Sequence, residues 1–221
     1  GTIRVDVVDH GGNGESVASR QFRADFVRGG NEYKAELTVD DPVLWDIDDP
    51  HLYRVNVSVE TDAGIHGKSV RHGFREFLVR DGFFYLNGRR IFLKSAHTGN
   101  AFPVGQMIPT FVKQTREDFV FAKAYGFNCI RNIAGMLRPE QLDLCDEIGL
   151  LIYSECFAAW QLGVGKYPIG DEEAMLQRFD NSTSYMIKRD RNHPCVVIWG
   201  LLNETLETSV FWRAVRYLPI G

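Results

Sequence analysis

The 221-residue sequence lacks the features that mark membrane, metal-binding and nucleic-acid-binding proteins. No apolar stretch approaches the ~20 residues that a membrane-spanning helix needs. None of the four cysteines forms a C-x-x-C pair, and the six histidines do not pair at metal-ligand spacing, so no zinc signature is present. The 25 lysines and arginines form no basic run and are outnumbered by 29 acidic residues, which argues against a nucleic-acid partner.

The composition is that of a folded globular chain. Apolar residues make up 44% and charged residues 24%, which excludes a disordered tail, a collagen or a coiled coil. The length allows one large domain or two small ones. Each cysteine lies in an apolar segment, so we expect buried small hydrophobic side chains and no disulfide at Cys129, Cys145, Cys156 and Cys195.

The first third of the chain has the pattern of a β-sheet domain. Residues 2–8, 32–39 and 53–60 alternate apolar and polar side chains, and glycine- and aspartate-rich turns separate them. Short alternating strands at this spacing predict an antiparallel sheet with one buried face, as in a β-sandwich. We expect Trp45 in the core of that sandwich.

From residue 83 onward the pattern changes to strands that alternate with helices. Such an order predicts a parallel sheet covered by helices. The four strands are expected at 90–94, 127–131, 150–154 and 196–202, and the helices at 114–125, 139–148, 171–189 and 209–218. Four units of about 35 residues amount to half of a (β/α)8 barrel, which typically has about 250 residues.

In such barrels the reactive side chains lie at the carboxyl ends of the strands. These positions are polar here and suit a hydroxyl-rich substrate: His97, Arg131, Glu155, Asn203 and Glu204. Trp160 and Trp199 can offer flat apolar faces to a sugar ring. Two interpretations of Glu204 remain open, a general acid at the barrel mouth and a helix N-terminal glutamate. Arg131 can likewise bind substrate or pair with Glu155 or Glu204.

The segment Asn192–Glu204, with the sequence NHPCVVIWGLLNE, resembles the acid/base signature of glycoside hydrolase family 2. Further similar motifs follow the family's order along the chain. They are P-x-L-W at 42–45, P-x-L-Y at 50–53, G-F-R at 73–75, N-x-x-R at 128–131 and C-D-E-x-G-L at 145–150. The resemblance covers most of the chain, from about residue 40 to Glu204.

This resemblance implies an immunoglobulin-like β-sandwich over residues 1–78 and the first four units of a TIM barrel over 79–221. It further implies retaining hydrolysis of a β-linked glycoside, β-galactosidase-like, with a carbohydrate substrate and no cofactor. Glu204 matches the acid/base, Asn203 the residue that binds the sugar 2-hydroxyl, and Arg131 an arginine at the base of the sugar site. Glu155 matches an acidic position near the site, and His97 falls in the variable loop after strand one.

The sequence also departs from the family pattern. Residues 132–135 (NIAG) replace a Ser-His-Tyr-Pro type stretch, and the stretch 94–100 replaces the usual strand-one sequence. The family nucleophile lies on a later barrel strand, so we expect a fragment that is inactive alone and that self-associates by pairing two half barrels. His193 is expected to have a structural role. The competing class is a non-catalytic carbohydrate-binding or scaffold protein derived from a glycosidase.

Overall fold

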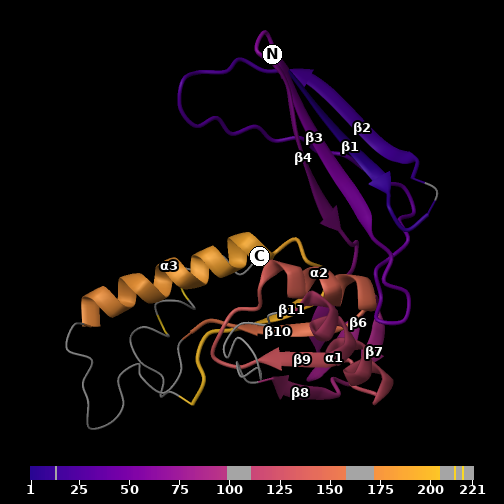
Figure 1. Cartoon of the computed structure of the whole chain (residues 1–221), viewed down its shortest axis with the longest axis vertical. Helices are drawn as coiled ribbons and strands as arrows, with labels where there is room; N and C mark the ends of the chain where they lie inside the picture. Colours follow the sequence, from indigo (N-terminus) through magenta and orange to yellow (C-terminus); the bar gives the residue numbers. More distant parts are fainter. Residues whose placement is uncertain (13, 99–110, 158–171, 205–211, 213–215, 217–221) are drawn as a thin grey trace.

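Figure 1 shows a computed structural model in which a long antiparallel sheet stands next to a compact α/β part. The structure describes residues 1–12, 14–98, 111–157 and 172–204 together with Trp212 and Arg216. In helix α3 (Glu172–Asp190), the side chains are described from residue 177 onward. Within this part of the chain, no helix is long and apolar enough to cross a membrane. The helix predicted at 209–218 lies outside the described residues, apart from Trp212 and Arg216.

The N-terminal sheet has the strand order β2-β1-β3-β4 and is antiparallel throughout. Its strands are β1 (Thr2–Asp9), β2 (Ser16–Arg23), β3 (Tyr53–Thr61) and β4 (Gly64–His72). The alternating patterns at 2–8 and 53–60 form strands, as predicted, and these are the two central strands of the sheet. The edge strands β2 and β4 were not predicted, because they are mostly exposed and carry polar residues on both faces.

The strand predicted at 32–39 does not form. Ala35, Leu37 and Val39 are half-buried and alternate with exposed residues, so the period of two is present. The segment nevertheless pairs with no strand of the described chain, and the Glu36 carbonyl accepts a hydrogen bond from the Arg20 side chain at 3.0 Å. Alternation alone predicts an extended backbone, whereas a strand also needs a neighbouring backbone.

A small three-stranded sheet follows, formed by β5 (Phe77–Arg80), β6 (Phe83–Leu86) and β7 (Arg89–Ile91). Asn87 and Gly88 connect β6 to β7 with φ of 51° and 74°, as a two-residue hairpin requires. The prediction of a first barrel strand at 90–94 was therefore wrong. Arg90 and Ile91 belong to this antiparallel hairpin, and the parallel sheet starts at Ser95.

The parallel sheet has the order β11-β10-β9-β8 and corresponds to four consecutive barrel strands. They are β8 (Ser95–Thr98), β9 (Cys129–Asn132), β10 (Leu151–Glu155) and β11 (Val196–Gly200). The helices are α1 (Val112–Ala124), α2 (Pro139–Ile148) and α3 (Glu172–Asp190). Gly149 ends α2 in the left-handed conformation at φ 75°, as the sequence predicted.

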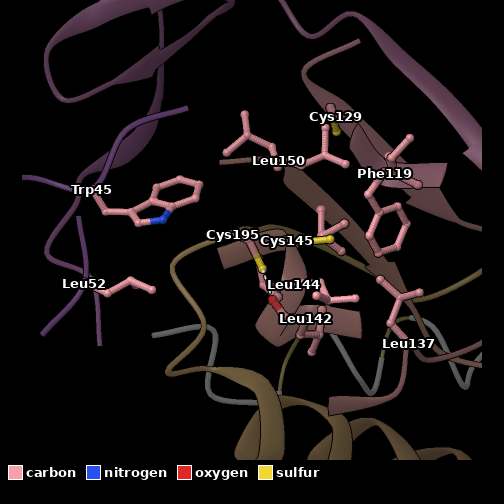
Figure 2. Close-up of a cluster of buried hydrophobic side chains, with 14 residues drawn as sticks. Trp45, Leu52, Phe119, Cys129, Leu137, Leu142, Leu144, Cys145, Leu150 and Cys195 are labelled. Atoms are coloured by element: carbon pink, nitrogen blue, oxygen red, sulfur yellow. Dashed lines mark hydrogen bonds between the residues drawn. The ribbon is translucent and has the colours of Figure 1, made fainter. Parts of the chain in front are cut away.

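The main core lies between the parallel sheet and its helices, and Trp45 belongs to it (Figure 2). Trp45 is fully buried together with Leu142, Cys145 and Leu150 of the α/β part. Its predicted place in the sandwich core was wrong, since the segment that connects β2 to β3 inserts the indole against the α/β part. All four cysteines are free and buried, as predicted. Burial raises the pKa of the Cys145 and Cys195 thiols, which keeps them protonated and inert.

Asp146 of α2 connects the two parts of the molecule. Its backbone carbonyl accepts a hydrogen bond from Trp45 Nε1 at 2.8 Å. The carboxylate oxygen Oδ1 accepts from the Cys195 backbone N–H at 3.0 Å, and Oδ2 lies 2.6 Å from His193 Nδ1. The side chain is 1% exposed, so these contacts satisfy a buried carboxylate. His193 therefore holds the chain just before β11, in agreement with a structural role.

Gly73 and Arg75, in the segment that connects β4 to β5, complete this junction. A Cβ atom on Gly73 would lie 2.8 Å from Pro194 Cγ and 2.9 Å from Trp45 Cβ, so only glycine fits there. Arg75 donates from Nε to the Pro194 carbonyl at 3.1 Å and from Nη2 to the Val196 carbonyl at 2.7 Å. The β4–β5 connection thus binds backbone groups at the start of β11.

Trp45 provides a test of this coupling. Because the indole is fully buried, Trp45→Ala should lower the free energy of unfolding by about 3–5 kcal/mol. Trp45→Phe keeps most of the apolar bulk but leaves the Asp146 carbonyl without its donor, which should cost about 1–2 kcal/mol. Urea unfolding followed by circular dichroism measures both. Trp212→Phe is the control, because Trp212 is 48% exposed and its loss should cost less than about 0.5 kcal/mol. Equal effects of Trp45→Phe and the control would contradict the coupling.

His193 provides a pH-dependent test. Burial lowers the pKa of His193, but the hydrogen bond and charge of Asp146 and the charges of Asp143 and Asp190 outweigh it, and the pKa is raised. A raised folded-state pKa stabilises the protein below the unfolded value of about 6.5, and this stabilisation is lost as the pH rises through the folded value. The Tm gap between the wild type and His193→Gln should therefore narrow as the pH rises from acid to alkaline. The control His66→Gln removes an exposed imidazole of β4. A gap that widens with pH would refute the assignment.

Candidate active site

Four of the predicted site residues lie at the carboxyl ends of neighbouring parallel strands. Arg131 lies on β9, Glu155 ends β10, and Asn203 and Glu204 follow β11. The strand register places Arg131 opposite Tyr153 and Glu155 opposite Gly200. Register partners in a parallel sheet point to the same face, so these positions share the face that becomes the inside of a barrel.

Arg131 links Glu155 to Asn203. Its Nε donates a hydrogen bond to Glu155 Oε1, and its Nη2 donates to Asn203 Oδ1 at 2.6 Å. The hydrogen bond to Glu155 raises the pKa of Arg131, and the charges of Glu155, Tyr153 and Glu204 raise it further. The guanidinium therefore stays protonated and fixes the orientation of the Asn203 amide, which is 4% exposed.

Glu155 is 1% exposed, and both of its carboxylate oxygens are engaged. Oε1 accepts from Arg131, and Oε2 accepts from the Ala134 backbone N–H at 2.9 Å. Ala134 adopts φ 52°, a left-handed conformation that is uncommon for a residue with a Cβ and costs about 1 kcal/mol. The loop after β9 thus bends back so that its N–H meets Glu155.

Gly200 and Tyr153 shape the space around Glu155. A Cβ atom on Gly200 would clash with Glu155 Cγ and lie 2.5 Å from Tyr153 Cε2. The Arg131 guanidinium carbon lies 5.3 Å from the centre of the Tyr153 ring, within cation–π range. Sequence analysis did not single out Gly200, Tyr153 or the Ala134 N–H. A glycine inside an apolar strand is the one local signal that could have indicated the close approach.

Glu204 follows Asn203 with an exposed side chain and φ 46°. This left-handed backbone conformation turns the chain after β11. The charge of the Glu204 carboxylate contributes to the raised pKa of Arg131. The acid therefore lies in the electrostatic neighbourhood of the Arg131 pair. The alternative role at a helix N-terminus depends on residues 205–211, which lie outside the described residues.

The remaining predicted residues are less closely associated with this group. His97 is exposed on β8 and is the register partner of Arg131, so both belong to the same face. Trp160 lies outside the described residues. The suggested role of Trp199 in contacting a sugar was wrong. Its register partner is Ser154, whose hydroxyl contacts Met186 of α3, and Trp199 packs against the core on that side.

One group of potential metal ligands occurs in the part of the chain that the structure describes. Atoms of Asp143, Asp146 and His193 lie within 4.8 Å of one another. They belong to the junction at the amino-terminal end of β11, away from the Arg131 pair. Asp146 and His193 already bond to each other, and Asp143 pairs with Arg71, so hydrogen bonds within the protein account for this group.

Two descriptions of one enzyme family match most of the chain. Residues 77–217 match "Glycosyl hydrolases family 2, TIM barrel domain", and residues 1–75 match "Glycosyl hydrolases family 2". The chain belongs to glycosyl hydrolase family 2. The parallel β/α units are accordingly part of a TIM barrel that follows an antiparallel β domain, as the sequence predicted.

Family 2 relatives and solved structures agree with this assignment. A β-galactosidase of Thermoanaerobacter pseudethanolicus is 32% identical over 98% of this chain, and one of Thermoanaerobacterium thermosulfurigenes is 29% identical over 96%. A β-glucuronidase structure of Parabacteroides merdae superposes with a TM-score of 0.77 at 28% identity over 94% of the chain. The chain spans 28% and 29% of the two β-galactosidases and 25% of the β-glucuronidase.

Gly200 provides a test of the site geometry. Gly200→Ala should lower the free energy of unfolding by about 1–3 kcal/mol, because the new methyl group overlaps Glu155 and Tyr153 in a packed region. The control is Gly30→Ala, where a Cβ atom meets nothing within 4 Å and the effect should stay within about 0.5 kcal/mol. Urea unfolding of both variants measures the difference. If Gly200→Ala were as stable as the control, the close approach of β10 and β11 would be wrong.

Proposed function

We propose that this chain forms the acid/base half of the active site of a β-glycosidase that retains anomeric configuration. The observation that supports this most directly is the hydrogen-bonded chain Glu155–Arg131–Asn203, with Glu204 next to it, at the carboxyl ends of barrel strands. Family membership supplies the reaction class, and the relatives named β-galactosidase favour a galactoside. The β-glucuronidase at 28% identity makes a glucuronide the second candidate.

In this proposal Glu204 acts twice. In the first step its carboxylic acid protonates the glycosidic oxygen of the leaving group while a second carboxylate attacks the anomeric carbon. In the second step the Glu204 carboxylate removes a proton from water, which displaces the enzyme carboxylate from the same carbon. Retaining enzymes hold the two carboxyl groups about 5–5.5 Å apart. The exposed side chain of Glu204 suits contact with a substrate that enters from solvent.

The other residues bind and position the sugar. Asn203 binds the sugar 2-hydroxyl, and Arg131 lies at the base of the site. Glu155 is proposed as a positioning residue, since its oxygens are engaged by Arg131 and the Ala134 N–H. It holds Arg131 in the orientation that aligns the Asn203 amide. His97 and Trp160 are proposed to contact the substrate from the loops that follow the first and third strands.

We further propose that the active enzyme is longer than this chain. The antiparallel β domain at 1–78 and the half barrel at 79–221 span about a quarter of the matched relatives, and the nucleophile would come from sequence outside residues 1–221. The parallel sheet has β8 and β11 at its edges, where backbone groups can pair with further strands. The isolated chain is therefore expected to self-associate by pairing two half barrels.

The test of function uses the uninterrupted reading frame that contains this chain. Aryl β-galactoside, β-glucuronide, β-mannoside and β-glucoside are assayed with the parent enzyme and with Glu204→Ala. One glycoside should be turned over, and the variant should lose about 10²–10⁴-fold in kcat, most strongly for poor leaving groups, because general acid catalysis is lost. Glu140→Ala, an exposed glutamate on α2, is the matched control and should keep full activity.

Either of two results would refute this assignment. Turnover that is unchanged by Glu204→Ala would remove Glu204 from the chemistry. Absence of turnover combined with saturable binding of the sugar would favour the non-catalytic carbohydrate-binding alternative. The purified 221-residue chain should show no turnover with any of the four glycosides, and light scattering should give a mass above that of the monomer.

A further inference from the structure

A polar cleft of about 370 Å³ lies between the antiparallel sheet and the half barrel. Arg54 of β3 and Arg71 of β4 line it from the sheet, and Arg189, His193 and Asp143 line it from the barrel. His193 lies three residues before the first residue of β11, so the cleft is at the amino-terminal end of the strands, opposite the proposed sugar site. Its chemistry is therefore separate from the proposed glycosidase reaction.

Arg54 and Arg71 are direct register partners across the antiparallel strands β3 and β4. Partners in such a ladder point to the same face with Cβ atoms about 4.5–5.5 Å apart, and like charges in this arrangement are destabilising. A sheet that places two arginines opposite each other beside a cleft needs negative charge nearby to offset their repulsion.

The other basic groups of the cleft have carboxylate partners. Arg71 pairs with Asp143 and with Glu147, the latter at 2.6 Å. Arg189 Nη2 donates to Asp190 Oδ2 at 2.7 Å, and His193 bonds to Asp146. Glu147 also pairs with Arg116 at 2.8 Å. The four acids therefore match Arg71, Arg116, Arg189 and a protonated His193, and they leave no spare negative charge for Arg54.

Arg54 lacks such a partner. Its side chain is half-buried, and no carboxylate contacts it among the residues that the structure describes. Its guanidinium donates to His10 Nε2 at 3.3 Å, and an imidazole nitrogen carries no negative charge to balance it. The cleft thus contains one cation more than its carboxylates neutralise, on a planar group that binds oxyanions through two parallel hydrogen bonds.

We propose that this cleft is a binding site for a small oxyanion, with Arg54 as its principal ligand. The neutral donors Ser69 and Asn192 also line the cleft and can complete the coordination. The volume is sufficient for one oxyanion and several water molecules, since a water molecule occupies about 30 Å³ in the liquid. The bound anion bridges the sheet to the loop before β11, so it stabilises the junction between the two parts of the molecule.

The test is isothermal titration calorimetry of the 221-residue chain with sodium phosphate, sodium sulfate and sodium acetate, in chloride buffer at constant ionic strength. Phosphate and sulfate should bind saturably at one site and raise the Tm, and acetate should bind more weakly, because it offers fewer acceptor oxygens. Arg54→Gln should weaken phosphate binding roughly tenfold or more, the effect of losing a charged hydrogen-bond donor. Arg90→Gln is the control, since it removes the same charge from the separate sheet β5–β7.

A second variant keeps the test decisive if Arg54→Gln folds poorly. Ser69→Asp places a fixed carboxylate in the cleft on the face that carries Arg54. It should raise the Tm in the absence of phosphate and abolish phosphate binding. The proposal is overturned if no anion binds saturably at millimolar concentrations, or if Arg54→Gln and Arg90→Gln weaken binding to the same extent. The proposal would also be overturned if Ser69→Asp bound phosphate as tightly as the wild type does.

Discussion

The buried carboxyl group of Asp146 is the constraint on which the arrangement of the molecule depends. A carboxylate that is 1% exposed requires hydrogen-bond partners, and Asp146 finds them in His193 and in the backbone N–H of Cys195. Its own carbonyl receives the indole N–H of Trp45. One residue of α2 therefore determines where the segment around Trp45 meets the barrel and where β11 begins. The position of β11 in turn determines where Asn203 and Glu204 emerge.

Asp146 lies where several of the family motifs meet. Trp45, Gly73, Arg75 and the Asn-His-Pro segment are far apart in the sequence but meet at the amino-terminal end of β11. The Asn-Glu pair of the same signature follows the other end of that strand. The first half of the signature thus stabilises the junction, and the second half carries the residues proposed for chemistry. A β-strand of five residues keeps the two ends about 17 Å apart, so the junction constrains the site only through the strand.

Sequence reasoning correctly predicted the helices and strands whose apolar residues form a clear pattern. The central strands β1 and β3 and the three helices have such a period, and the parallel strands β9 to β11 are short, nearly continuous apolar runs. It missed the edge strands β2 and β4, whose polar faces carry no period, and it predicted a strand at 32–39 that has no partner. It placed Arg131, Glu155, Asn203 and Glu204 at strand ends, and pairing of Arg131 with Glu155 was one of its alternatives. The Ala134 N–H and the close approach at Gly200 could not be predicted, because they depend on the path of a loop and on the spacing between strands.

Hydrogen–deuterium exchange of the wild type and of Asp146→Ala tests most directly whether this residue couples the segment around Trp45 to β11. The account predicts that the variant loses protection together at the amides of Trp45, which bonds to the Phe74 carbonyl, and of residues 196–200 in β11. Leu78 in the separate sheet β5–β7 should keep its exchange rate. Faster exchange confined to Cys195, which loses its own acceptor, would show that Asp146 serves only a local contact and would contradict the account.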